Sequence, residues 1–128
     1  MRCVISLFLI ATLSLSGMSP LAAQPAPGTI DFDPDPADTF MLTSQVNSTD
    51  IFVCKLTTDG ELVWAKQFHG NQPHFGGVGY DIAVNSLGEV YSTGTIGGSI
   101  DFDPGTTNFY LEPSVSGQTE AYLSKLDV

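Results

Sequence analysis

The stretch that decides the fold is Gly79–Gly94, which reads Gly-Tyr-Asp-Ile-Ala-Val-Asn-Ser-Leu-Gly-Glu-Val-Tyr-Ser-Thr-Gly. Residues 80–84 and 89–93 are rich in β-branched and aromatic side chains, which suit a pleated, half-buried surface. Between them, the segment Asn85–Gly88 contains Asn, Ser and Gly, which tolerate or supply the positive φ of a tight turn. The stretch therefore predicts two short antiparallel strands joined by a hairpin turn.

The same pattern of short strand, polar turn and short strand continues on both sides of this hairpin. A second hairpin is predicted around Asp59-Gly60, a dipeptide that is a strong turn signal. No amphipathic helical pattern of useful length follows residue 23, so the sequence predicts an all-β fold. Outside the first hairpin, strands are expected at residues 29–33, 39–43, 50–57, 61–68, 108–111 and 120–126.

The chain also contains an internal repeat, because it overlays itself without a gap when it is shifted by 70 positions. Ile30–Pro34 and Ile100–Pro104 both read Ile-Asp-Phe-Asp-Pro. In the same register Phe40 meets Tyr110, and the predicted strand at 50–56 meets the one at 120–126. A repeat of this length with several strand-like segments predicts propeller blades or a β-solenoid.

These residues resemble the bacterial secreted β-propeller repeat, or SBBP-type, family. The likeness is carried by Gly79–Val84, Gly88–Gly94, Asp50–Leu56 and Leu62–Lys66, and it covers about residues 50–128, with Ile30–Pro34 as a trace of the preceding repeat. It implies that residues 80–84 and 89–93 are the two inner strands of a blade and that residues 120–126 are its third strand. Residues 50–57 and 61–68 would then be the third and fourth strands of the blade before.

The predicted fold class is thus all-β, with antiparallel, β-propeller-blade-like sheets that form an incomplete propeller. A propeller closes with about four to eight blades, whereas this chain holds about one and a half repeats. A single blade does not bury both of its faces, so we expect open sheet faces and unpaired strand edges. Such a chain is a truncated array, part of something larger, or a unit that assembles with itself.

The first 23 residues predict a signal peptide. Met1–Arg2 is charged, Val4–Leu15 is apolar but too short for a membrane span, and small residues lead to Ala23, after which cleavage is expected. The alternative is an uncleaved anchor or a buried strand. The predicted organisation is therefore a signal peptide at 1–23, a Pro-rich leader and partial repeat at 24–49, and a β-propeller-type repeat region at 50–128. We expect an exported protein, either secreted or in the cell envelope, with no membrane insertion after signal removal.

The charge of the chain limits the classes of partner that it could bind. The chain has 14 Asp and Glu against 4 Lys and Arg, and its formal net charge is −10. This balance argues against nucleic acid and anionic membranes as partners.

Cys54 is the one cysteine after the predicted signal, so no intrachain disulfide is expected. We predict a small buried side chain at Cys54, with pairing between chains as the alternative.

Five carboxylates are candidate Ca²⁺ ligands, because this ion takes several oxygen ligands and they cluster in Pro-containing turns. Their spacing is not that of an EF-hand, since Pro36 and Leu42 stand where its Gly and Glu are needed. The alternative is a solvated acidic edge that discourages strand pairing. The candidates are Asp31, Asp33, Asp35, Asp101 and Asp103.

Other candidate sites are weaker. His69 and His74 share a Gly-rich loop, but a closed Zn²⁺ site needs four ligands. Trp64 and Tyr91 are candidates for a sugar-binding face, against the simpler reading that they fill the core. No serine stands in a nucleophile-elbow motif, and no glycine cluster precedes a helix as a phosphate loop would require.

The sequence therefore predicts a protein that is not an enzyme. Its expected role is that of an exported, non-catalytic β-repeat protein in surface recognition or assembly, and its expected partner is itself or a longer propeller chain. One alternative is a Ca²⁺- or carbohydrate-binding module, and another is a non-functional remnant of a longer propeller protein. No cofactor other than Ca²⁺ is suggested.

Overall fold

The computed structural model describes residues 7–13, 28–71 and 75–127, and for residues 7–13 it describes the backbone alone. This part of the chain is all-β, and it contains no helix that could span a membrane. The expected all-β, antiparallel fold is confirmed. The strands are β1 (Leu7–Leu13), β2 (Thr29–Asp31), β3 (Met41–Thr43), β4 (Asp50–Leu56), β5 (Leu62–Gly70), β6 (Gly77–Val84), β7 (Val90–Ile96), β8 (Ile100–Asp101), β9 (Tyr110–Leu111) and β10 (Glu120–Leu126).

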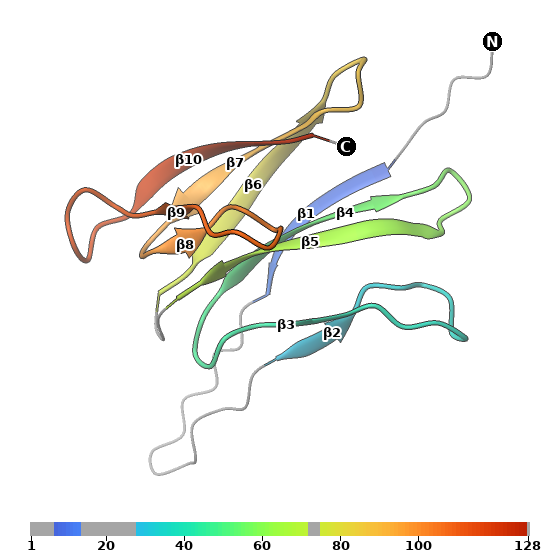
Figure 1. Cartoon of the computed structure of the whole chain (residues 1–128), viewed down its shortest axis with the longest axis horizontal. Coiled ribbons are helices and arrows are strands. Elements are labelled where there is room, and N and C mark those ends of the chain that lie inside the picture. Colours follow the sequence, from blue (N-terminus) through green and yellow to red (C-terminus); the bar gives the residue numbers. More distant parts are fainter. Residues whose placement is uncertain (1–6, 14–27, 72–74, 128) are drawn as a thin grey trace.

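These strands form three antiparallel sheets, none closed into a barrel. The first sheet has the order β1-β4-β5-β8-β9, the second has the order β10-β7-β6, and β2 pairs with β3 alone. Figure 1 shows the second sheet on one side of β1, β4 and β5, and the β2–β3 hairpin on the other side. The molecule is thus a stack with the first sheet in the middle.

The hairpin that decides the fold forms as expected, and its strands are longer than predicted. β6 begins at Gly77 and β7 ends at Ile96, which are cross-strand partners. In the turn, the side-chain Oδ1 of Asn85 accepts hydrogen bonds from the backbone N–H groups of Leu87 and Glu89, both at 3.0 Å. Gly88 has a φ of +84°, a left-handed conformation that favours glycine.

The core lies between the first and second sheets. Its buried residues come from both sheets and from the segment that begins with β8: Ile51, Val53, Phe68, Val90, Ile96, Ile100, Phe102 and Tyr122. Gly77 of β6 lies directly over Ile51, because a Cβ placed on Gly77 would stand 2.5 Å from the Cδ1 atom of Ile51. The sheets therefore pack so closely here that a side chain at position 77 would displace the end of the Ile51 side chain.

The β1 strand lies within the predicted signal peptide. It pairs with β4 from Leu7 opposite Leu56 to Leu13 opposite Asp50. β7 pairs with β10 in the corresponding way, from Val90 opposite Leu126 to Ile96 opposite Glu120. β4 and β10 are repeat equivalents. β1 therefore pairs with β4 at the same edge and in the same register as β7 pairs with β10. Cleavage after Ala23 stays a prediction, and it would remove this partner of β4.

The 70-residue repeat appears as two units of the same shape, a first unit at residues 28–56 and a second unit at residues 98–126. In each unit a short hairpin leads through a polar turn into a long strand, β4 or β10. Asn47 in one turn and Gly117 in the other both have a positive φ, of 56° and 79°. The aromatic contact also recurs, as Phe32 with Phe52 at 4.4 Å and as Phe102 with Tyr122 at 4.8 Å between ring centroids.

The prediction that the two repeats align without a gap is wrong by one residue inside the short hairpin of each unit. Phe32 donates its N–H to the carbonyl of Phe40, and Phe102 donates to the carbonyl of Phe109, both at 2.9 Å. The structural counterpart of Phe40 is therefore Phe109, and not Tyr110. The first hairpin loop is one residue longer, and the register returns before β4 and β10.

Candidate functional site: the acidic turns and the two ends of the stack

The Ile-Asp-Phe-Asp-Pro motifs form the same hydrogen-bonded turn in both units. In the first unit, Oδ1 of Asp31 accepts the N–H of Asp33 at 3.0 Å and the N–H of Phe40 at 2.8 Å. In the same loop Asp33 accepts the N–H of Asp35, and Asp35 accepts the N–H of Ala37, both at 2.9 Å. Each carboxylate thus closes a turn of its own backbone, as Asp commonly does.

The second motif repeats this arrangement in a buried setting. Oδ1 of Asp101 accepts the N–H of Asp103 at 3.0 Å and the N–H of Phe109 at 2.8 Å. Its Oδ2 accepts the side-chain amide of Asn108 at 2.6 Å. Burial by itself raises the pKa of Asp101, whereas these hydrogen bonds and the nearby His69 lower it, and the net pKa lies below the ordinary value. Asp103 in turn accepts the N–H of Gly105 at 2.8 Å and the hydroxyl of Thr107.

The structure does not bring the five candidate Ca²⁺ ligands into one cluster. Asp31, Asp33 and Asp35 lie in the first hairpin loop, and Asp101 and Asp103 lie in the second. Within residues 28–71 and 75–127, no group of three or more acidic, His or Cys side chains is placed to hold a metal ion. The hydrogen bonds give these residues a structural role, and Ca²⁺ binding stays a prediction that a thermal shift with Ca²⁺ and with chelator would test.

The remaining candidates are spread over the first and second sheets. His69 lies on β5 opposite Asp101, and His74 lies outside the described residues. Cys54 is 4% exposed, so the prediction that it is buried is confirmed. Trp64 packs against the core as a partly buried residue, while Tyr91 donates its hydroxyl to Glu89 at 3.2 Å. The structure does not bring Trp64 and Tyr91 together on one strand pair, because they lie on β5 and β7.

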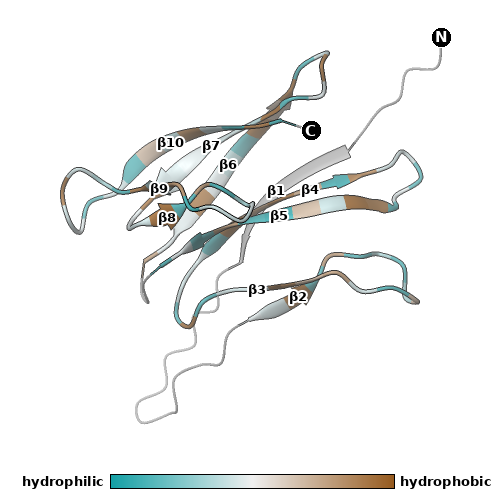
Figure 2. Ribbon diagram, in the orientation of Figure 1, coloured by the Kyte–Doolittle hydropathy of each residue, from teal (hydrophilic) through white to brown (hydrophobic). Residues whose placement is uncertain are grey.

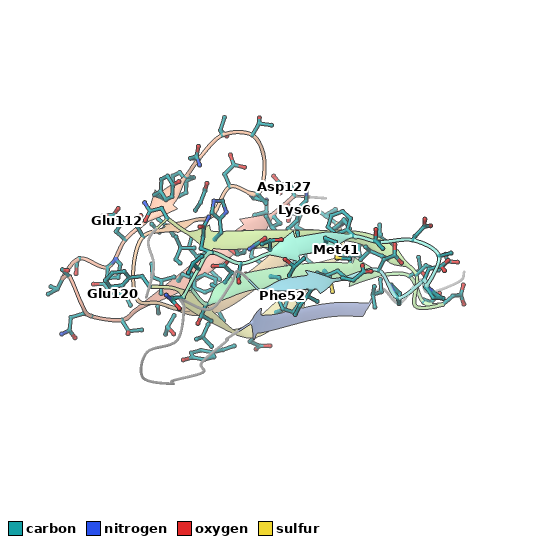
Figure 3. All side chains as sticks on the ribbon, turned by 90° about the horizontal axis from the view of Figure 1, so that it is seen from below. Met41, Phe52, Lys66, Glu112, Glu120 and Asp127 are labelled. Carbon is teal, nitrogen blue, oxygen red and sulfur yellow. The ribbon has the colours of Figure 1, made fainter. Side chains whose placement is uncertain are left out.

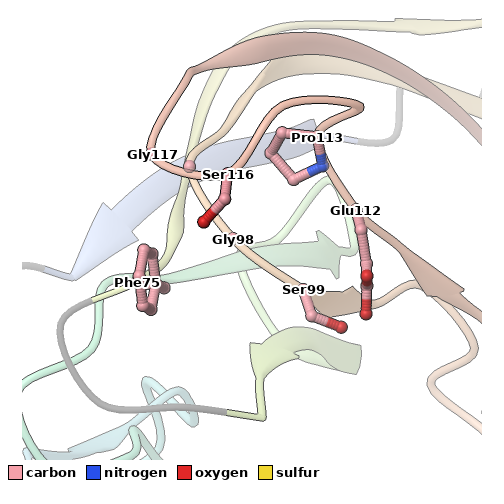
Figure 4. Close-up of a pocket in the computed structure, with 8 residues that line it drawn as sticks. Phe75, Gly98, Ser99, Glu112, Pro113, Ser116 and Gly117 are labelled. Atoms are coloured by element: carbon pink, nitrogen blue, oxygen red, sulfur yellow. The ribbon is translucent and has the colours of Figure 1, made fainter.

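A hollow of about 210 Å³ lies where the Gly97-Gly98 turn meets the loop before β10. Figure 4 shows Phe75, Ser99 and Glu112 around it, from three separate segments. Its lining supplies hydroxyl groups and one carboxylate, and neither His nor Lys is among the described lining residues. This set does not assemble a nucleophile with an oriented base, so the hollow carries no catalytic proposal.

Among the large apolar side chains on the described strands, Leu123 of β10 is the most exposed, at 73%. It belongs to the outer face of the second sheet, the face turned away from the first sheet. Thr93 is its cross-strand partner, and Asp81 lies beyond Thr93 on β6. Nearby, Tyr80 is 66% exposed at a β-bulge, and its hydroxyl accepts a hydrogen bond from Thr95 at 3.2 Å. We call this set of residues the outer face: Val78, Tyr80, Asp81, Ala83, Tyr91, Thr93, Thr95, Ala121, Leu123 and Lys125.

A second apolar surface lies at the opposite end of the stack, on the β2–β3 hairpin. Ile30 is 37% exposed, Phe40 is 39% exposed and Met41 is 56% exposed. Figure 3 shows Met41 and Phe52 on the side of the first sheet that carries this hairpin. We call Ile30, Phe32, Phe40, Met41 and Phe52 the hairpin end.

The sequence reasoning did not single out either surface. Side-chain type gives no signal, because hydropathy alternates along β10 much as it does along other strands (Figure 2). The 70-residue shift is the sequence feature that points to these surfaces, because it aligns Leu123 with Val53 and Ile30 with Ile100. Only the structure shows that one member of each pair is buried and the other exposed.

Comparisons of the chain with protein-family models, with curated proteins and with solved structures found no match.

Proposed function

We propose that this chain is an exported, non-catalytic β-repeat protein of the SBBP type that acts in assembly or surface recognition. The observation that carries the proposal is the contrast between Val53, which is 0% exposed, and its repeat equivalent Leu123, which is 73% exposed. The second sheet covers the face of β4 that holds Val53. The same face of β10 has no such cover among the described residues.

The composition of the outer face supports a protein partner. Ala83, Tyr91 and Leu123 line a shallow depression of about 110 Å³, together with the polar Asp81 and Thr93. Contiguous apolar patches with polar neighbours typically mark interaction surfaces. The partner is a sheet of the same kind, in another copy of this chain or in a longer propeller chain.

The free edge of β10 is a weaker docking feature than the outer face. The described partner of β10 is β7 alone, and the predicted cleavage after Ala23 would likewise leave β4 paired with β5 alone. However, Lys125 lies on β10 and forms ion pairs with Glu89 at 2.6 Å and with Asp127 at 2.9 Å. A charged lysine on an edge strand discourages the addition of another strand.

Sedimentation velocity of the chain recovered after export tests the proposal. We expect the sedimentation coefficient to rise over micromolar concentrations, and we expect Leu123→Asp to remove that rise. Leu87→Asp is the matched control, because Leu87 is 81% exposed in the β6–β7 turn and lies off the outer face. A folded wild-type monomer at every concentration would contradict self-assembly and leave a longer propeller chain as the partner to be tested by co-sedimentation.

A further inference from the structure

The buried core joins two halves from different units, and side chains outside both units complete it. One half is Ile51 and Val53 of β4, in the first unit. The other half is Ile100 of β8, Phe102 and Tyr122 of β10, in the second unit. Ile51, Val53 and Ile100 are 0% exposed. Phe68 of β5 and Val90 and Ile96 of β7 belong to the same cluster but to neither unit. The chain therefore shows how a unit of this kind meets the next unit.

Each half has a repeat equivalent that lies unmatched at one end of the stack. Ala121 and Leu123 of the outer face correspond to Ile51 and Val53. Ile30, Phe32 and Phe52 of the hairpin end correspond to Ile100, Phe102 and Tyr122. Ile30 is 37% exposed, whereas Ile100 is 0% exposed. The two ends thus carry the repeat equivalents of two groups of side chains that already share one buried cluster inside the molecule.

We propose that the outer face of one copy packs against the hairpin end of a second copy, head to tail. This inference rests on the proposed assembly function and specifies its partner and its geometry. The contact joins unlike surfaces, so every added copy presents a free outer face or a free hairpin end. Such a contact builds an open chain or a closed ring, and not an isolated two-fold dimer.

The contact between copies is smaller than the internal one. The outer face has Ala121 at the position where the internal contact has the larger Ile51. Less apolar surface is therefore buried at this position between copies, and since affinity follows the quality of the buried contact, we expect assembly that reverses on dilution.

A mixing experiment tests the head-to-tail geometry. Leu123→Asp blocks the outer face and Ile30→Asp blocks the hairpin end, so each variant alone is expected to be monomeric. An equimolar mixture retains one intact outer face and one intact hairpin end, and it is expected to form a one-to-one dimer and nothing larger. The measurement is the molar mass by light scattering after size exclusion, with circular dichroism to verify folding. The milder pair Leu123→Thr and Ile30→Thr replaces any aspartate variant that does not fold.

Two other outcomes separate this inference from the proposed function. If Leu123→Asp abolishes assembly while Ile30→Asp assembles like the wild type, two outer faces meet each other. The head-to-tail geometry is then wrong and the assembly function stands. If the wild type does not assemble at any concentration, the head-to-tail contact between copies is also wrong. Leu87→Asp should assemble like the wild type in every case.

Discussion

The first unit, at residues 28–56, and the second unit, at residues 98–126, have the same local structure in different surroundings. Their Asp turns use the same acceptor atom with the same pair of backbone donors. Yet Asp101 is 2% exposed while its counterpart Asp31 is exposed, and Val53 is buried while Leu123 is not. Local sequence therefore sets the shape of a unit, and the neighbouring sheet determines which of its faces is buried.

The comparison also shows why the β8–β9 hairpin is more deeply buried than the β2–β3 hairpin. β8 pairs with β5, with His69 opposite Asp101 and Gly70 opposite Ile100. β2 pairs with β3, and within the described residues no second strand pairs with β2 as β5 pairs with β8. The second hairpin is thus held against the core, whereas the first rests on one face of the first sheet. Equivalent substitutions in the two units should consequently have unequal effects on stability.

The largest inequality is expected for the aromatic residue of the motif. Phe102 is 8% exposed and contacts both Phe68 and Tyr122, so Phe102→Ala should lower the free energy of unfolding by about 3–5 kcal/mol. Phe32 is half-buried, and Phe32→Ala should cost about 1–2 kcal/mol because less apolar surface is lost. Urea unfolding at low protein concentration measures both. Equal losses would show that the two hairpins contribute alike.

A smaller difference is expected for the first aspartate of the motif. Asp101→Ala leaves the N–H groups of Asp103 and Phe109 without their acceptor in a partly buried place, at a cost of about 1–3 kcal/mol. Asp31→Ala should cost less than about 1 kcal/mol, because water reaches the donors in the exposed loop. The same urea titrations give this comparison, and a greater loss in the Asp31 variant would reverse it.

The lowered pKa of Asp101 predicts a dependence of stability on pH. Its folded-state pKa lies below the value in the unfolded chain, so its contribution is complete above about pH 4 and is lost as the pH falls through the folded-state pKa. Asp101→Asn keeps an acceptor oxygen without titrating. Unfolding between pH 7 and pH 3 should be less steeply pH-dependent in this variant than in the wild type, and identical slopes would contradict the prediction.

The smallest difference is expected in the turns that precede β4 and β10. Gly117 has a φ of +79°, so Gly117→Ala should cost about 1 kcal/mol through left-handed strain. Asn tolerates this conformation, as Asn47 does at a φ of 56°, and Gly117→Asn should therefore cost less than Gly117→Ala. Thermal unfolding compares the two variants, and an alanine variant as stable as the wild type would show that the turn relaxes.

The sequence predicted the strands that carry strong local signals. Asn85 and Gly88 marked the central hairpin, and the shift of 70 positions identified the two units. It did not predict that β6 begins as early as Gly77, because this extension follows from pairing with Ile96 and from packing on Ile51. Similarly, it did not predict which of Val53 and Leu123 is covered, since burial at equivalent positions depends on a neighbour and not on the residues themselves.

The acidic motifs teach a related lesson about sites. Alternating carboxylates at Asp31, Asp33 and Asp35 were compatible with metal ligands by type and spacing. Their hydrogen bonds show that each also closes a turn in its own loop. A local pattern of side chains therefore left two roles open. The backbone geometry shows the structural role, and Ca²⁺ binding stays a prediction.

Amide hydrogen exchange along β4 and β10 tests the central claim most directly. It compares equivalent strands with and without a covering sheet, and its dependence on concentration separates that cover from the second edge partner of β4. At low protein concentration the account predicts slower exchange in Asp50–Leu56 than in Glu120–Leu126. As the concentration rises into the micromolar range, exchange in β10 should slow while exchange in β4 stays constant, because a second copy covers Leu123. Exchange in β10 that is as slow as in β4 when dilute, or that does not change with concentration, would contradict the account.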